Sequence, residues 1–205
     1  MIKISDNYVD IELPAKSLEL STKFANAQVG SSIDCYQKRG QGSAHRIVSQ
    51  IISGKLAEIA VAKFYSSLGL VVSMPDFRVY HEGAKSYDAD LDINFGNRFY
   101  PLHVKSISSE SASKFGLSWI FQRSDPLYFA PARIDLKDDR IALCETLSDS
   151  CVRFYGLCDP NLMKSNSKPL KVKALQHTKV ALYHKEISEH LNLLPQIDAI
   201  TTFSP

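Results

Sequence analysis

Apolar side chains recur at steps of three and four residues between positions 44 and 68, which is the spacing of one face of an α-helix. Ser43 precedes this pattern and is a good N-cap, while Gly69 follows it and is a typical C-terminal stop. The pattern predicts a long amphipathic helix over 44–68, with Gly54 inside it as a point of close packing or a kink. Its apolar positions are Ile47, Val48, Ile51, Ile52, Ile59, Val61, Phe64 and Leu68.

Short runs that alternate between apolar and polar residues, or that gather β-branched and aromatic residues, predict strands after this helix. Two of them, 87–95 and 99–107, meet at the turn sequence NFGN at 94–97 and predict a hairpin. Because proline is poorly tolerated inside a central strand, Pro101 suggests that the second strand begins at Leu102 or carries a bulge. Further strands are predicted over 70–72, 118–122, 139–145 and 151–157.

The remaining segments have weaker patterns. Residues 1–30 contain short extended runs without a period, 31–44 are interpreted as a polar loop, and 185–194 as a short helix that Pro195 ends. A helix, then mixed strands, then another helix predicts one α/β domain of mixed α+β type over 1–205. Its core is expected over about 44–125, with an N-terminal extension and loop over 1–43 and C-terminal strands, a basic segment and the short helix over 126–205.

The predicted hairpin carries an unusual set of charged side chains. Alternation along a strand puts Asp90 and Asp92 on one face, and it puts His103 and Lys105 together on the next strand. Charged groups in a half-buried sheet are costly unless they are paired or bound to metal. Metal-assisted phosphodiester cleavage uses such a group of carboxylates with a nearby cation. The alternative is a solvent-facing hairpin with a cross-strand ion pair such as Asp92 with Lys105.

Glu58 is a carboxylate on the apolar stripe of the predicted helix, seven residues after Ile51. A buried carboxylate without a partner is strongly disfavoured in its charged form. Glu58 is therefore expected to reach solvent at the rim, to pair with Lys55 or Lys63, or to point at the hairpin and help hold a cation.

Composition places broad limits on the function. A length of 205 residues with 44% hydrophobic and 22% charged residues is ordinary for a soluble protein. No apolar run of about 18 residues occurs, and the N-terminus is acidic, so we expect no membrane partner, no signal peptide and a cytoplasmic location. No P-loop, GxGxxG, GxSxG or HExxH motif is present, which leaves nucleotide-driven, dinucleotide, serine-hydrolase and zinc-hydrolase chemistry without support.

The cysteines are not arranged as a structural zinc site. Cys35, Cys144, Cys151 and Cys158 form no CxxC pair, and free cysteine is commonly buried. We therefore expect reduced, mostly buried thiols.

The net charge of +2 conceals an uneven distribution. No acidic residue occurs between Pro160 and Lys185, and a second basic cluster lies in QKRGQGSAHR. Such clusters attract polyanions and indicate contact with DNA or RNA, although a solvated lysine-rich face is the alternative. The candidate DNA-binding cations are Lys38, Arg39, Arg46, Lys171 and Lys173.

Glu58, Asp92 and Lys105, read together, resemble the PD-(D/E)XK nuclease superfamily. The most similar pattern is that of archaeal Holliday-junction resolvases, Mrr-type restriction endonucleases and small type II restriction enzymes. There, a helix glutamate precedes a strand aspartate, and a (D/E/Q)xK motif lies on the next strand. The matching segments are GKLAEIAVAKFYSSLG, ADLDI and LHVKS, within about residues 44–110, and His103 replaces the usual acid or glutamine.

The resemblance implies a restriction endonuclease-like core, in which helices flank a central mixed β-sheet. It implies that Asp92, Glu58 and the main-chain carbonyl of Val104 ligate Mg²⁺ or Mn²⁺. Asp90 is the alternative ligand, because it lies on the same strand face as Asp92. The metal would polarise the scissile phosphate and lower the pKa of a bound water.

The resemblance also assigns roles to the side chains around these ligands. Lys105 would stabilise the developing negative charge or orient the attacking water. His103 would contact the water or the phosphate, or favour manganese. Ser106 and Gln122 are candidate phosphate contacts, with ordinary strand-end hydrogen bonds as the alternative.

We therefore expect a metal-dependent endodeoxyribonuclease of restriction or phage type that acts on duplex or branched DNA. A homodimer is expected, because one such site cuts one strand. Two alternatives stay open. The first is a nuclease-like domain that binds DNA without cutting it, with His103 as the mark of a lost activity. The second is an α/β domain that acts in protein interaction without a nucleic-acid role.

Overall fold

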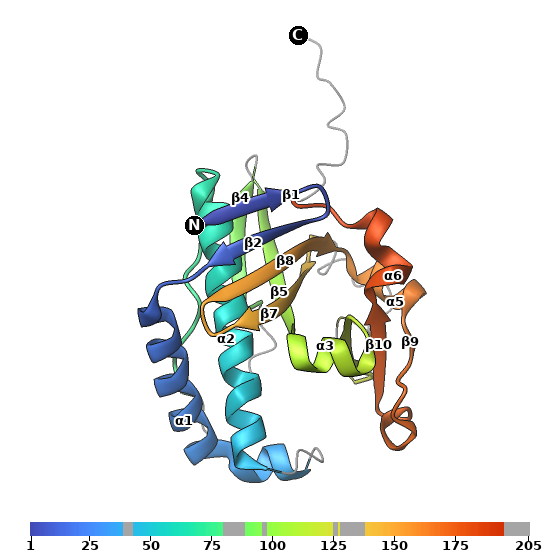
Figure 1. Cartoon of the computed structure of the whole chain (residues 1–205). Helices are drawn as coiled ribbons and strands as arrows, with labels where there is room; N and C mark the ends of the chain where they lie inside the picture. Colours follow the sequence, from blue (N-terminus) through green and yellow to red (C-terminus); the bar gives the residue numbers. More distant parts are fainter. Residues whose placement is uncertain (39–42, 80–88, 96–97, 125–126, 128–137, 195–205) are drawn as a thin grey trace.

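The structure is a computed structural model that describes residues 1–38, 43–79, 89–95, 98–124, 127 and 138–194, without the side chains of 31–38 and 174. Within these ranges it is a mixed α/β chain with a large mixed sheet in the order β1-β2-β8-β7-β5-β4-β3 and a small sheet in the order β6-β10-β9 (Figure 1). Helices flank the large sheet, as expected from the sequence.

The strands of the large sheet are β1 (Ile2–Ser5), β2 (Tyr8–Glu12), β3 (Val71–Val72), β4 (Leu91–Phe95), β5 (Arg98–Ser108), β7 (Arg140–Ser148) and β8 (Cys151–Cys158). Those of the small sheet are β6 (Ser118–Gln122), β9 (Lys168–Pro169) and β10 (Lys179–Tyr183). The helices are α1 (Ala15–Lys38), α2 (Ala44–Ser67), α3 (Ser109–Phe115), α5 (Pro160–Asn166) and α6 (His184–Ile187), with the 3₁₀ turns η2 (Lys173–Leu175) and η3 (Ser188–His190).

Helix α2 confirms the helix predicted from the apolar period. The Ser43 side chain accepts a hydrogen bond from the Arg46 amide at the N-terminus, which satisfies one of the free donors there. Gly69 follows the helix with φ of +81°, a backbone conformation that glycine adopts without strain. The helix continues through Gly54.

Helix α1 corrects the prediction for the N-terminal part of the chain. The expected loop over 31–44 is wrong for 31–38, because the helix runs to Lys38, and for Ala44, which begins α2; residues 39–42 lie outside the described part of the chain. The buried positions of α1 are four residues apart, at Ser17, Ser21, Ala25 and Val29, and the first three are small residues. Small side chains give only a weak apolar period, so the sequence pattern did not predict this helix. The buried face is identified by its packing beside α2 (Figure 1).

The predicted hairpin is confirmed by β4 and β5, which pair antiparallel with Leu91 opposite Leu102 and Asp92 opposite Pro101. The expectation that the second strand starts at Leu102 or bulges is wrong, since β5 begins at Arg98 and its pairing with β4 has no register shift. Pro101 is tolerated because its parallel neighbour β7 begins to pair only at Leu102. The missing amide therefore removes no bond of the ladder.

The prediction of a short C-terminal helix is correct only in part. Residues 184–187 form the single turn α6 and 188–190 a 3₁₀ turn, so no continuous helix covers 185–194.

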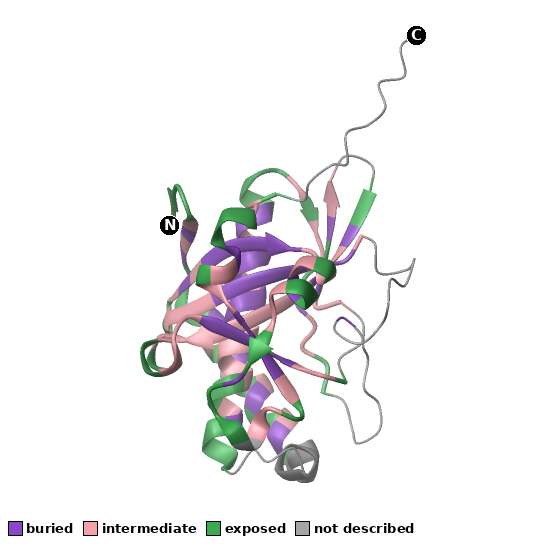
Figure 2. Cartoon of the chain, turned by 90° about the vertical axis from the view of Figure 1, so that its right-hand side faces the viewer, coloured by how far each residue is buried: buried purple, intermediate pink, exposed green. Residues whose placement is uncertain are grey.

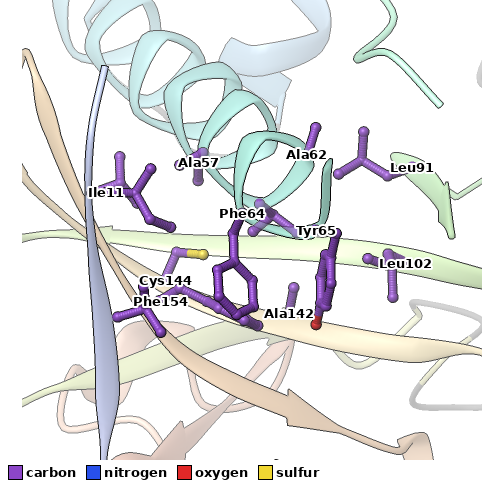
Figure 3. Close-up of a cluster of buried hydrophobic side chains, with 14 of the residues drawn as sticks. Ile11, Ala57, Ala62, Phe64, Tyr65, Leu91, Leu102, Ala142, Cys144 and Phe154 are labelled. Atoms are coloured by element: carbon purple, nitrogen blue, oxygen red, sulfur yellow. The ribbon is translucent and has the colours of Figure 1, made fainter. Parts of the chain in front are cut away.

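Each face of the large sheet packs against its own core. Between α2 and the sheet, Phe64 and Tyr65 pack on Phe154 with ring centroids 5.6 and 6.0 Å away (Figure 3). On the opposite face, Trp119 and Phe121 of the small sheet pack with residues of β7 and β8. Figure 2 shows the buried strands between these layers. Strand β5 therefore has the core under α2 on one face and the core under the small sheet on the other. Successive side chains of β5 point into these two different environments.

The cysteine thiols follow the predicted pattern where the structure describes them. Cys144, Cys151 and Cys158 are free, and Cys144 and Cys158 are buried. Burial raises the pKa of both buried thiols, so they stay protonated. The Cys35 side chain lies outside the described part of the chain.

Candidate functional site

The candidate site lies at the edge of the large sheet where β4 begins, beside the part of β5 that extends beyond its pairing with β4. Asp90 directly precedes β4, and its amide donates to the Leu102 carbonyl at 2.8 Å. Its carboxylate oxygen Oδ2 accepts a hydrogen bond from the Val104 amide at 2.7 Å. The N–H and C=O of one strand residue point the same way, so the Val104 carbonyl is directed to the same side of β5 as this carboxylate. Asp90 and the Val104 backbone thus lie together at this edge.

Glu58 reaches this region from α2. It is 7% exposed, and its Oε2 lies 2.6 Å from the Lys55 ammonium. Burial raises the pKa of Glu58 to about 7; the charge of Asp90 adds to the increase, and the charge of Lys55 and its hydrogen bond oppose it. A weaker contribution comes from Asp76. Asp90 is therefore close enough to Glu58 for its charge to disfavour ionisation of Glu58.

Lys55 is a site residue to which the sequence analysis gave no functional role. Its ammonium lies 5.0 Å from the ring centroid of Phe24 on α1 and 5.6 Å from that of Phe77. This is the salt bridge foreseen as one alternative for Glu58; the other candidate, Lys63, instead donates to the Glu12 carbonyl at 2.6 Å. The i,i+3 spacing was the sequence signal for this pair. Lys55 supplies positive charge beside the carboxylates.

Asp92 lies elsewhere. Leu91 and Ile93 on either side of it are buried in the core under α2, so Asp92 faces away from α2 and is exposed. Its amide donates to the Ser73 hydroxyl at 2.7 Å, and its carbonyl accepts from the Ser73 amide at 2.9 Å. The structure thus brings Asp90, the alternative ligand, beside Glu58.

His103 and Lys105 lie on the face of β5 opposite to α2. Val104 between them packs against the core under α2, so the two polar side chains point toward the small sheet. Lys105 Nζ lies 5.5 Å from the ring centroid of Phe121. His103 Nε2 lies 3.6 Å from Oδ2 of Asp139, a carboxylate that is almost completely buried. Asp139 is distant in sequence, so no local pattern could have revealed this pair.

The other predicted contact residues are dispersed. Ser106 lies on the α2 side, with its Oγ 3.3 Å from the Ser53 Oγ. Gln122 ends β6 opposite Lys179. Arg46, Lys171 and Lys173 are exposed. Arg39 and the side chain of Lys38 lie outside the described residues.

The donor set at the β5 edge fits a hard cation. Glu58, Asp90 and the Val104 carbonyl are oxygen donors, which Mg²⁺ and Mn²⁺ prefer, whereas His103 lies on the other face of the sheet. In the described part of the chain, no group of three or more His, Cys, Asp or Glu side chains is arranged to hold a metal ion. A cation here would depend on two carboxylates and a main-chain oxygen.

Comparison with family models, curated proteins and solved structures found no match to this chain. Among the helices that the structure describes, none has both the length and the apolar character needed to cross a membrane.

Proposed function

We propose that this protein is a metal-dependent endonuclease that hydrolyses phosphodiester bonds in DNA, with a restriction endonuclease-like core of the PD-(D/E)XK type. The observation that carries the proposal is that Asp90, bonded to the Val104 backbone where β4 begins, lies close enough to Glu58 for its charge to raise the Glu58 pKa. The order of a helix acid, a strand acid and an xVK segment on the next strand agrees with that superfamily. In this order, Asp90 takes the position that the sequence analysis assigned to Asp92.

Asp90, Glu58 and the Val104 carbonyl would hold Mg²⁺ or Mn²⁺ in this proposal. The bound ion would polarise the scissile phosphate and favour ionisation of a water molecule. Lys55 balances the charge of Glu58, and its contacts with Phe24 and Phe77 hold it in place. The protein thereby keeps two carboxylates close together, an arrangement that folding alone disfavours.

The opposite side of the β5 edge would contribute the groups that contact the phosphate. Lys105 would stabilise the negative charge that develops on the phosphate oxygens. His103, held near Asp139, would orient the water or hydrogen-bond the phosphate. Glu58 lies on the face of β5 that packs against α2, and Lys105 lies on the face toward the small sheet. Asp90 lies between these two faces, so the substrate would approach along the edge of β5.

The test is cleavage of supercoiled plasmid and branched DNA with Mg²⁺, with Mn²⁺ and with EDTA. Wild-type protein is expected to cut only with metal, and Asp90→Asn and Lys105→Ala are expected to reduce the rate at least about a hundredfold, the loss typical for removal of one catalytic group. Asp92→Asn is the matched control, because it makes the same change on an exposed aspartate two residues further along, inside β4. If Asp92→Asn loses activity and Asp90→Asn retains it, Asp92 rather than Asp90 is the metal ligand.

A second candidate function is DNA binding without cleavage. His103 stands where the superfamily has an acid or glutamine, and it faces Asp139 rather than Glu58. Binding that weakens with salt, combined with no cleavage in either metal, would favour this candidate. Absence of both activities would favour an α/β domain with a role in protein interaction.

We also propose that duplex cleavage uses a homodimer, because one site cuts one strand. Sedimentation velocity with and without duplex DNA measures this directly. A monomer that makes double-strand breaks with single-hit kinetics would contradict it.

A further inference from the structure

The small sheet leads into a surface that carries lysines but no acidic residue between Pro160 and Lys185. Three of these lysines, Lys168, Lys171 and Lys173, are exposed and close together in sequence; we call them the basic ledge. We propose that the basic ledge binds the phosphate backbone of the nucleic acid on which the protein acts. This inference rests on the proposed nuclease function and names the surface that positions its substrate.

The backbone that presents the ledge is fixed at several points. Gln176 donates through Nε2 to the Leu170 carbonyl at 2.7 Å, and Leu170 itself is buried. The Arg123 side chain donates to the Gln176 carbonyl at 3.2 Å, and its amide donates to the Thr178 carbonyl at 2.8 Å. The connection from β9 to β10 is therefore attached both to itself and to the end of β6. A fixed backbone lowers the entropy lost when the lysines engage a ligand.

Strand register extends the basic surface onto the outer face of the small sheet. Gln122 is paired directly with Lys179, and Lys168 with Ala181, two residues further along β10. Directly paired residues share a face, and Phe121 beside Gln122 is buried in the core, so these polar residues face away from it. Gln122, Lys179 and Lys168 thus share the outer face of the small sheet with Ala181 and the half-exposed Ile120, and Lys171 and Lys173 follow in the connection after β9.

The ledge lies on the same side of the large sheet as His103 and Lys105. Lys105 packs against Phe121 on β6, Phe121 is paired with Val180 on β10, and Val180 is paired with Pro169 on β9. Neighbouring strands are about 4.8 Å apart, so β9 lies roughly 10 Å from β6. Lys168 of the ledge lies on the outer face of the small sheet, whereas Phe121, which Lys105 contacts, lies on its inner face. A nucleic acid bound by the ledge would therefore approach Lys105 around the edge of the small sheet.

The charge pattern favours nucleic acid as the occupant. A phosphate backbone offers a regular row of negative charges, and its binding to lysines releases condensed counterions. Isolated ammonium groups on a polar surface suit such a row, because Lys binds phosphate as a point charge without needing a matched planar partner. An acidic protein is the competing occupant, and the experiment separates the two.

The experiment measures fluorescence anisotropy of a labelled duplex DNA in EDTA, at several salt concentrations, with the full chain. The double variant Lys171→Glu/Lys173→Glu is expected to bind at least tenfold more weakly than wild type. The slope of log K against log salt should fall by about 1.8 if both lysines contact phosphates. The control is Lys16→Glu/Lys23→Glu, which makes the same charge change on exposed residues of α1, beside α2 on the other side of the large sheet. This control is expected to change affinity less than threefold.

Equal losses in both double variants, or no loss in the ledge variant, would overturn the assignment. Competition by polyglutamate as effective as that by unlabelled DNA of equal charge would also overturn it, in favour of an acidic protein partner. Because the assay contains no metal, the result is independent of cleavage. If Asp90→Asn protein binds DNA normally but fails to cut it, both the nuclease proposal and the ledge proposal are supported. If the ledge variant binds DNA normally, only the ledge proposal is refuted.

Discussion

Glu58 is the residue on which the electrostatics of the candidate site depend most. Burial and the charge of Asp90 raise its pKa, whereas Lys55 lowers it, and the result of about 7 lies far above the ordinary value of 4.5. Such a perturbed carboxylate at the edge of a sheet is typical of a functional site, although structural ion pairs produce the same effect. The energetic consequence is measurable without any substrate.

The folded protein is expected to lose stability as the pH rises from about 5 to about 8, because Glu58 keeps its proton in the folded state up to about pH 7 but releases it near pH 4.5 when unfolded. The folded state binds more protons in this window, so the free energy of unfolding falls as the pH rises, and the full cost is present above about pH 8. The difference amounts to at most roughly 3–4 kcal/mol, the shift of the Glu58 pKa from 4.5 to about 7 taken at about 1.36 kcal/mol per unit. Urea unfolding of wild type and Glu58→Gln in EDTA measures it.

Glu58→Gln should remove this part of the pH dependence, while Glu19→Gln, on the exposed face of α1, should retain it. Parallel curves for wild type and Glu58→Gln would show that Glu58 titrates normally.

At the scale of single elements, α2 is the most regular part of the chain, and its two glycines have opposite meanings. A Cβ at Gly54 would meet nothing within 4 Å, so this glycine serves no close packing. A Cβ at Gly69 would also meet nothing, but the backbone there has φ of +81°. The first glycine therefore only weakens the helix, whereas the second ends it.

Gly54→Ala is expected to stabilise the protein by about 0.5–1 kcal/mol, because alanine restricts the unfolded chain and favours the helix. Gly69→Ala is expected to destabilise it by about 1–2 kcal/mol, because a side chain is strained at positive φ. Thermal unfolding followed by circular dichroism measures both. A stability loss in Gly54→Ala would mean that α2 needs a kink at this point.

At the scale of the whole molecule, the contact between the two sheets decides what faces β5. Trp119 of β6 is 1% exposed, and its indole Nε1 donates to the Cys144 carbonyl of β7 at 2.7 Å. The bond fastens the small sheet to the large one across the second core. It also fixes the position of Phe121, against which Lys105 packs.

Trp119→Phe is expected to lower the free energy of unfolding by roughly 1–3 kcal/mol, because it leaves the buried Cys144 carbonyl without its donor. The replacement also leaves a space in the core, which adds to the loss. Phe99→Leu, at a side chain that is 66% exposed, is the control and should change stability by less than about 0.5 kcal/mol. Equal effects of the two variants would show that the indole bond does not hold the sheets together.

The sequence by itself determined the elements whose patterns are local. The period of apolar residues and its two caps located α2, and alternation with a turn located the β4–β5 hairpin, because these signals depend only on neighbouring residues. The i,i+3 spacing also made the Lys55–Glu58 pair foreseeable as one alternative. The small-residue face of α1 gave too weak a period to predict its helix.

Only the tertiary structure decided which side chains meet. Strand alternation put Asp90 and Asp92 on the same face, so the sequence pattern did not distinguish them. They differ in the structure because β4 begins after Asp90, which lies just outside the strand and accepts a hydrogen bond from the Val104 amide. The separation of Lys105 from α2 depends on which face of β5 each core covers. The contact of His103 with Asp139 depends on the parallel pairing of β5 with β7, which joins segments far apart in the chain. Long-range pairing is chosen by the burial of the whole chain, so no local pattern encodes it.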